Sequence, residues 1–303
     1  MIDSFTVSPC GSGDGEVTMP VRIGDILNDT YAGIVDPAAR RYHPGIPTGF
    51  TDLDNLLTGM HGGELIVVGA RPSMGKTSFA LSIVSHVAMR EGKAVALFCP
   101  DMPRELAAMR LLCSAARVDP QKVRSGQLTG EMREALAGAL PSVSSAPVRI
   151  DDTPGLTPEM LEDRCRRLKA EDRLDLIVID YLGLIRADEE TGNRNRETVA
   201  ICRKLKTIAR ELDVPVMLCT QVARPGNGMT GRRPVMSDLR DGGALEQTAD
   251  VILFLYRADY YDIRPKKQQT CEVMIMKHRN GPLGTVILAW LQECATFTDL
   301  SAE

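Results

Sequence analysis

The stretch at residues 64–78, ELIVVGARPSMGKTS, constrains the fold of this chain more than any other. It begins with the apolar run Leu65–Val68, which has the composition of a strand buried on both faces. A loop follows, and Gly75, Lys76 and Thr77 open a segment with the apolar period of a helix. A strand, a loop and Gly-Lys-Thr at a helix start form the context that a phosphate-binding loop requires.

The chemistry of such a loop follows from its backbone. Successive N–H groups form an anion-binding nest, and the helix N-terminus adds partial positive charge. Lys76 would reach the β- and γ-phosphates of a nucleotide, and the Thr77 hydroxyl would hold Mg²⁺. One departure is that the eight-residue pattern starts with Ala70, whereas glycine stands one place earlier, at Gly69. We expect the whole loop to contact the nucleotide, namely Ala70, Arg71, Pro72, Ser73, Met74, Gly75, Lys76, Thr77 and Ser78.

Length and composition set wider bounds. With 303 residues, the chain has room for one large α/β domain or two small ones. A net charge of −4 and a pI near 5.7 argue against a protein that coats nucleic acid, although a local basic patch stays possible. The eight cysteines include no C-x-x-C pair, so we interpret them as buried apolar residues in a reducing compartment. No signal peptide or membrane-spanning run is visible, which favours the cytoplasm.

Strands alternate with helices after the loop, and two further strands follow near the C-terminus. This order predicts an α/β fold with a mostly parallel sheet flanked by helices. The last two strands, joined through residues 280–282, predict an antiparallel hairpin at one sheet edge. Residues 121–127 are expected to form a turn, and a helix from Thr129 is expected to stop before Pro141. The strands after the loop are expected at 93–98, 147–151, 174–180, 214–220, 250–256, 272–277 and 285–290.

The first 20 residues are rich in small and polar types without a period, and they predict a disordered arm. Residues 21–35 differ, because apolar side chains recur there at helical spacing. A short amphipathic helix needs something to cover its apolar face. It could fold back on its own domain or dock on a neighbouring subunit, and the sequence leaves both alternatives open.

Polar residues that follow predicted strands are the candidates for catalysis. Asp180 fits a carboxylate on the Mg²⁺ side, and Asp101 is a candidate general base. The alternative for Asp101 is a helix cap before Pro103. Gln221 could hydrogen-bond the γ-phosphate and report its presence. Because ligands bind at the carboxyl ends of parallel strands, we expect the polar candidates to lie there.

Lys277 and Arg279 are predicted at the end of an edge strand. Their simpler role would be a solvated edge that discourages aggregation. Their more specific role would be that of an arginine finger that reaches into a neighbouring subunit's site.

Five motifs now make a family resemblance specific. The chain resembles the ATPase core of DnaB-like replicative helicases, a RecA-like P-loop NTPase domain, from about residue 46 to residue 300. The resemblance implies three regions: an arm at 1–20, a linker helix and loop at 21–45, and the RecA-like domain at 46–303. The motifs are ARPSMGKT at 70–77, IDD and GLTPEML within 150–161, VIDYL at 178–182, SDLRDGGALEQTAD at 237–250 and KHRNGPLGTV at 277–286.

The resemblance implies a hexameric ring with ATP at subunit interfaces and 5′ to 3′ movement on one DNA strand. By family position, Asp101 matches the catalytic glutamate, Asp180 the Mg²⁺-side acid and Gln221 the sensor. Lys277 and Arg279 match residues that a neighbouring subunit supplies. ATP and Mg²⁺ are the implied cofactors, with Thr77 and Asp180 on the metal.

The resemblance also implies a site for single-stranded DNA. The residues that match the DNA-gripping loop of the family are Arg240, Asp241, Gly242 and Gly243. An arginine can pair with a phosphate, and glycines can offer N–H groups at close approach. A ring repeats these contacts, which reconciles DNA binding with an acidic chain. Primase or a helicase loader are the further implied partners.

Three departures from the family pattern matter. Asp101 stands where the family has Glu, so its carboxyl is closer to the backbone by about 1.5 Å, a displacement that can cost about a hundredfold in rate. Gly183 stands where the family usually has Gln. Only the arm and short helix precede the core, where the family has a collar domain that engages primase. These departures keep open a second hypothesis: a nucleotide-gated DNA-binding or assembly protein with weak hydrolysis.

Overall fold

The computed structural model describes residues 20–27, 31, 45–171, 173–188, 192–223, 231–240, 242–261 and 269–300. The chain divides into two compact units, Met1–His43 and Pro44–Glu303. The predicted arm, apart from its last residue, lies outside the described residues. In the first unit residues 23–27 are helical, within the helix predicted at 21–35. Apolar side chains there are exposed, namely Val21, Ile23, Ile26, Leu27 and Tyr31.

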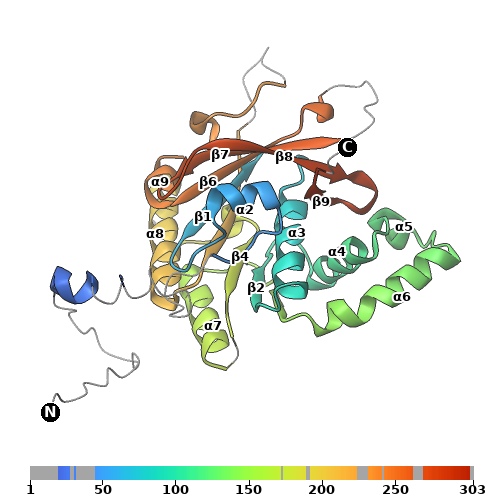
Figure 1. Ribbon diagram of the computed structural model, residues 1–303, viewed down its shortest axis with the longest axis horizontal. Helices are drawn as coiled ribbons and strands as arrows, with labels where there is room; N and C mark the ends of the chain where they lie inside the picture. Colours follow the sequence, from blue (N-terminus) through green and yellow to red (C-terminus); the bar gives the residue numbers. More distant parts are fainter. Residues whose placement is uncertain are drawn as a thin grey trace. The chain divides into compact units, whose positions relative to one another are not determined.

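The second unit is built on one sheet (Figure 1). Its described residues form nine strands in the order β3-β2-β4-β5-β1-β6-β7-β8-β9. The first six in this order are parallel, and β7, β8 and β9 continue the sheet in antiparallel fashion. The bounds are β1 Leu65–Ala70, β2 Val95–Phe98, β3 Val148–Asp151, β4 Leu176–Ile179, β5 Val216–Gln221, β6 Val251–Tyr256, β7 Thr270–His278, β8 Gly284–Leu291 and β9 Thr296–Asp299.

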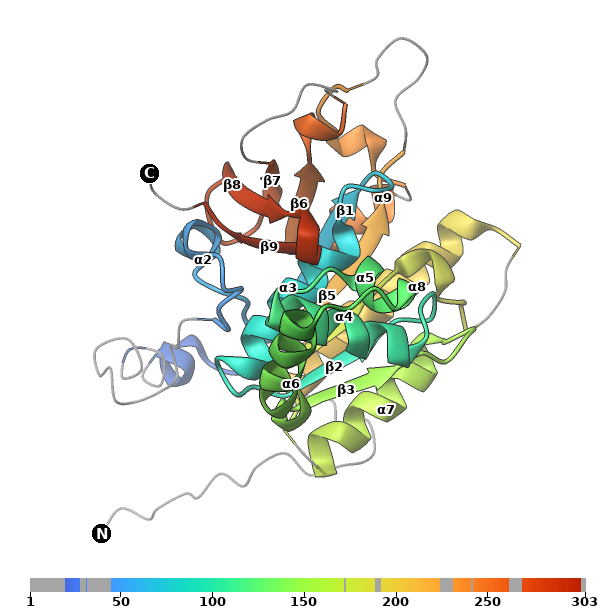
Figure 2. The same cartoon turned by 90° about the vertical axis from the view of Figure 1, so that its right-hand side faces the viewer.

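Helices cover both faces of this sheet, as Figure 2 shows from the side. One hydrophobic cluster joins the sheet to α2, α3 and α4, and a second joins it to α7, α8 and α9. Side chains alternate along β1, with Ile66 and Val68 in the first cluster and Leu65 and Val67 in the second. The helices are α2 Thr51–Leu57, α3 Lys76–Met89, α4 Arg104–Ala116, α5 Pro120–Ser125, α6 Gly130–Ser145, α7 Pro158–Glu171, α8 Arg194–Leu212 and α9 Gly242–Thr248.

This arrangement confirms the predicted α/β fold, and it confirms burial for the cysteines that the structure describes. All seven cysteines in the described residues are free and buried. Burial raises the pKa of the Cys165 thiol to about 12, so this thiol stays protonated. No helix among the described residues is long and apolar enough to cross a membrane.

Two local predictions in the helical region were wrong. Residues 121–127 do not form a simple turn, because α5 occupies Pro120–Ser125. Its start is fixed by Asp119, whose side chain accepts a hydrogen bond from the Gln121 N–H. The helix that opens after Thr129 does not stop before Pro141 but continues to Ser145.

The predicted C-terminal hairpin is present, but it is not at the sheet edge. β7 pairs with β6 on one side and with β8 on the other, and β9 lies beyond β8. The prediction that Lys277 and Arg279 end an edge strand was therefore wrong. The sequence did not predict β9, because this strand has only four residues. It forms by pairing with β8, where Trp290 lies opposite Phe297.

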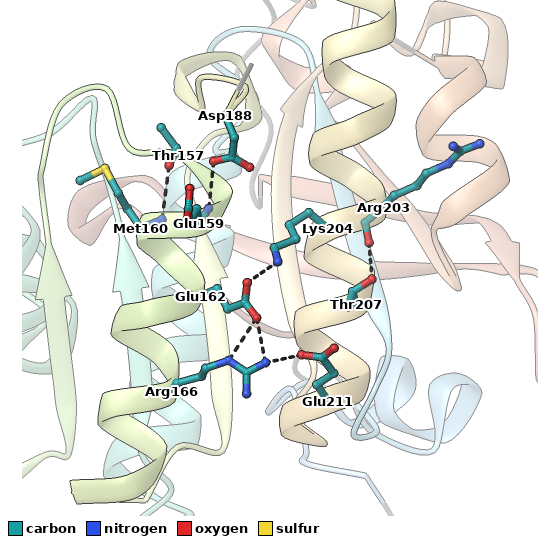
Figure 3. Close-up of polar contacts among 10 residues, drawn as sticks. All are labelled: Thr157, Glu159, Met160, Glu162, Arg166, Asp188, Arg203, Lys204, Thr207 and Glu211. Carbon is teal, nitrogen blue, oxygen red and sulfur yellow. Dashed lines mark hydrogen bonds and ion pairs between the residues drawn. The ribbon is translucent and has the colours of Figure 1, made fainter. Parts of the chain in front are cut away.

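Charged side chains join α7 to α8 on the outer surface (Figure 3). Glu162 accepts hydrogen bonds from Arg166 at 3.1 and 2.8 Å and forms an ion pair with Lys204. Arg166 also donates to Glu211 of α8 at 2.5 Å. Burial raises the pKa of Glu162, but the hydrogen bonds from Lys204 and Arg166 outweigh this and hold it below its usual value.

Candidate functional site

The phosphate-binding loop connects β1 to α3 at the carboxyl end of the parallel strands. β1 lies between β5 and β6, so the loop starts from the middle of the sheet. Gly75 is the N-cap of α3, with a φ of +92° that disfavours a side chain. An added Cβ there would come within 2.8 Å of the Phe297 ring. No side chain caps α3, so the N–H groups of its first turn stay open to an anion.

Three predicted residues meet at the start of α3. The Lys76 ammonium donates a hydrogen bond to Asp180 Oδ1 at 2.7 Å. The Thr77 hydroxyl donates to Asp180 Oδ2 at 2.5 Å. Asp180 follows the buried strand β4 directly and is 7% exposed. A cation, a hydroxyl and a carboxylate thus converge in one place.

Gly183, where the family usually has Gln, lies beside the ring of Tyr181, which contacts this cluster. The Tyr181 ring lies 4.5 Å from the Lys76 ammonium, in cation–π contact. A Cβ added at Gly183 would come within 2.4 Å of the same ring. Any side chain at position 183 would therefore displace Tyr181 from its place over Lys76.

A cavity of about 580 Å³ opens above the loop. Most predicted loop residues line it, as does Gln221, but Met74 is buried beneath with 1% exposure. Eight further residues that no sequence motif marked line the cavity. Arg110 lies on α4 and Trp290 on β8, and neither follows a parallel strand, so no motif marked them. The eight are Leu106, Met109, Arg110, Pro120, Gln121, Arg124, Trp290 and Ala295.

Asp101 lies in the turn between β2 and α4, and its side chain is exposed. It is not among the residues that line the cavity. It does not cap α4 either, because the Arg104 N–H donates to Asp152 Oδ2 at 3.0 Å. The capping alternative for Asp101 is therefore wrong. The Asp101 carboxylate has no hydrogen-bond or ion-pair partner among the described residues, and it stays available to a water molecule.

Gln221 connects the cavity to the predicted DNA segment. It ends β5, and its backbone oxygen accepts a hydrogen bond from the Arg240 N–H at 3.3 Å. Its side-chain oxygen lies 3.5 Å from Arg240 Nη1. Gly242 and Gly243 form the first turn of α9. Asp241 lies outside the described residues.

Lys277 and Arg279 lie at the opposite end of the sheet from Lys76. Val251, at the start of β6, pairs with His278, whereas the other end of β6 pairs with the end of β1 at Ala70. The expectation that every polar candidate lies at the carboxyl ends of the parallel strands was therefore wrong for these two. The reason is that β7 runs antiparallel to β6 and ends where β6 begins.

Both cations bind the C-terminal end of α9. Lys277 donates to the backbone oxygens of Glu246 and Ala249, each at 2.6 Å. Arg279 donates to the Gln247 oxygen at 2.8 Å. Positive charge at a helix C-terminus is favourable, so the helix holds them in place. Burial, together with the nearby Arg279 guanidinium, lowers the pKa of Lys277.

The fold and the site together define a class. A phosphate-binding loop after a central parallel strand, beside strands that end in Asp180 and Gln221, is the architecture of a RecA-like P-loop nucleotide-binding domain. A family model described as "DnaB-like helicase C terminal domain" matches residues 45–299. The chain belongs to this family, as the motifs predicted.

Curated relatives agree with this family. The chain is 44% identical over 280 residues to "Replicative DNA helicase DnaC" of Bacillus subtilis (strain 168). It is also 44% identical over 280 residues to "Replicative DNA helicase DnaB" of Geobacillus stearothermophilus. Each match covers 92% of this chain and 62% of the relative. The chain thus spans about three fifths of the length of these relatives.

Solved structures agree as well. One of them, described as an "ATPase Domain", superimposes with a TM-score of 0.86 and 34% identity, and the match covers 93% of this chain and 100% of that chain. A second match is "The Structure Of A DnaB-Like Replicative Helicase And Its Interactions With Primase", with a TM-score of 0.85 and 34% identity. That match covers 92% of this chain and 69% of the other.

Proposed function

We propose that this chain is the motor of a ring-forming replicative DNA helicase, which couples ATP hydrolysis to 5′ to 3′ movement along single-stranded DNA. The cluster of Lys76, Thr77 and Asp180 is the observation that carries the proposal. Membership of the DnaB-like family supports the direction of movement and the hexameric ring.

The donor set fits a nucleotide with Mg²⁺. Mg²⁺ prefers oxygen ligands and usually takes only one or two from the protein, with the rest from water and phosphates. Thr77 and Asp180 supply two such oxygens. Among the described residues no group of three or more His, Cys, Asp or Glu side chains could hold a metal alone, which agrees with a shared ion. The Lys76 ammonium would leave Asp180 and pair with the phosphates instead. A bound ion would supply positive charge to neutralise the charge that develops on them.

Hydrolysis requires a base and transition-state charge. Asp101 would take a proton from the attacking water, and its exposed carboxylate is free to do so. Gln221 would sense the γ-phosphate from the cavity wall. Lys277 and Arg279 are at the wrong end of their own sheet to help, so a neighbouring copy would supply them.

DNA would bind at residues 240–243, in the centre of the ring. Arg240 is exposed, and the Gly243 N–H lies in the first turn of α9, whereas the Gly242 N–H donates to the Leu239 oxygen at 3.1 Å. The contact between Arg240 and Gln221 would connect DNA binding to nucleotide state. A related structure describes interactions with primase, so primase is a proposed partner here, as is a helicase loader. A replicative role would place the protein in the cytoplasm.

A second candidate function is a nucleotide-gated DNA-binding or assembly protein with weak hydrolysis. Asp101 favours it, because this shorter acid does not line the cavity.

One experiment separates the two functions. ATP hydrolysis is measured with and without single-stranded DNA, and the mass of the oligomer is recorded on the same sample. The motor predicts strong stimulation by DNA in a particle of ring size. Binding of ATP without stimulation, or in a monomer, would contradict the motor and favour the second function.

A further inference from the structure

Arg71 is a buried arginine at the start of the phosphate-binding loop. It follows the last residue of β1 directly and is 4% exposed. Its Nη1 donates a hydrogen bond to the Arg232 backbone oxygen at 2.7 Å and lies 3.4 Å from the Tyr261 hydroxyl. A residue of the phosphate-binding loop thus holds residues 231–240, the segment that leads into the predicted DNA contacts.

Only one of the three guanidinium nitrogens of Arg71 donates a hydrogen bond within the described residues. Arg71 Nη2 lies 3.8 Å from Asp238 Oδ2, which is an ion pair but too long for a hydrogen bond. Neither Nε nor Nη2 has a hydrogen-bond partner within the described part of the chain. A buried cation with unpaired donors is costly, so the arrangement gains from any movement that completes the contact.

Asp238 is held by several contacts within residues 231–240, so a movement of Asp238 would move this segment. It accepts hydrogen bonds from Arg232 Nη2 at 2.6 Å and from the Val235 N–H at 3.1 Å. Its own backbone oxygen accepts from the Ala223 N–H at 2.7 Å. It stands two residues before Arg240. A shift of this acid therefore moves the segment that reaches the DNA.

We propose that Arg71 and Asp238 couple the phosphate-binding loop to residues 231–240. Arg71 acts as a positioning residue: when the loop closes on a nucleotide, Nη2 approaches Asp238 by about 1 Å, from ion-pair to hydrogen-bond distance, and fixes the segment for DNA. The inference deepens the proposed function and rests on it, since it assumes that the loop binds ATP. The contact between Arg71 and Asp238 would be a second, buried connection between the nucleotide site and the DNA segment, beside the exposed contact between Gln221 and Arg240.

Hydrogen exchange of the full chain tests this route. Exchange in a peptide that covers residues 231–240 is measured with and without Mg²⁺ and a non-hydrolysable ATP analogue. In the unmodified protein we expect the analogue to slow exchange at least fivefold. Asp238→Asn keeps the shape but removes the charge, and we expect it to abolish most of this effect. Asp238→Glu restores the charge and should recover part of it.

Arg233→Gln is the matched control. Arg233 lies in the same segment, but its guanidinium pairs with Glu272 of β7, at 2.6 and 2.7 Å, instead of with the loop. This variant should keep the full nucleotide effect. Equal losses in Asp238→Asn and Arg233→Gln would overturn the proposal, as would an unmodified protein that binds the analogue with no change in the segment.

Nucleotide affinity is measured on the same samples through Trp290, the single tryptophan of the chain, which lines the cavity. Asp238→Asn should bind the analogue within about threefold of the unmodified protein. If nucleotide affinity fell together with the exchange effect, Asp238 would only support the shape of the phosphate-binding loop, and the coupling would be refuted. Absence of DNA-stimulated hydrolysis in the unmodified protein would instead refute the motor, while the exchange result would still decide the coupling.

Discussion

The two ends of the central sheet differ in how their charged residues are used. At the carboxyl end of β1, Lys76 and Thr77 bind Asp180 beside an open cavity. At the other end, Lys277 and Arg279 bind the last carbonyl groups of α9. The first end presents a phosphate cradle, lined among others by Lys76, Arg110 and Arg124, and the second presents Lys277 and Arg279 without a cradle.

Under the proposed function, one copy of this chain carries two halves of a site. An isolated subunit cannot bring the halves together, because they lie at opposite ends of the same strands. Under the proposed function, the cation end of one subunit meets the cradle end of the next.

The largest effect is expected at the cation end. Arg279→Ala should lower the rate of ATP hydrolysis by about a thousandfold, the usual loss for an arginine finger. Nucleotide affinity should change little, because the binding groups are on another subunit. Steady-state hydrolysis and nucleotide titration check the two parts. Arg203→Ala, an exposed arginine of α8, is the control, and an equal loss in that variant would contradict a specific role for Arg279.

A variant at the cradle end should lose nucleotide affinity as well as hydrolysis. Lys76→Ala removes the charge that faces the phosphates, so hydrolysis should fall at least about a hundredfold. Nucleotide affinity should fall with it, in contrast to Arg279→Ala. The same two assays check this. If the two variants lost affinity to the same degree, the division into a cradle and a cation end would break down.

A third prediction concerns the base. Asp101→Glu lengthens the side chain by one methylene and should raise hydrolysis about tenfold if the carboxylate is now too far from the water. Single-turnover hydrolysis gives this rate without product release. An inactive Asp101→Glu protein would show that the site is built around the shorter acid.

The smallest effect is expected at the ion pairs between α7 and α8. The pKa of Glu162 is held below its usual value, so its ion pairs stabilise the protein above that value, about pH 4.3, and are lost as the pH falls through the lowered pKa. Glu162→Gln should cost about 1 kcal/mol of unfolding free energy at pH 7. Denaturation at a series of pH values from 7 downward checks this, since the difference should shrink as the pH falls through the lowered pKa. Hydrolysis should not change.

The cradle end could be predicted from the sequence because its signals are local. The apolar run before Gly69 and the Gly-Lys-Thr after it fix a strand, a loop and a helix within a few residues. Asp180 follows the buried strand β4 and Gln221 ends the buried strand β5, and parallel strands bring such ends together. The family resemblance added the order of the motifs, and the comparisons confirmed the family.

The cation end could not be placed in this way, because its position depends on pairing between distant strands. The antiparallel register of β7 on β6 decides where Lys277 and Arg279 lie, and no local pattern encodes it. The same holds for Trp290, which enters the cavity from β8. The helix α5 was missed for a different reason: its cap at Asp119 and proline at the first position were present, but the segment is only six residues long.

The measurement that tests the divided site most directly is a mixture of two inactive proteins. Arg279→Ala subunits carry an intact cradle, and Lys76→Ala subunits carry intact cations, so a mixed ring contains some complete sites. The account predicts that hydrolysis reappears on mixing and depends on the ratio of the two proteins. If no ratio restored any activity in particles shown to contain both, the site would not be shared between subunits.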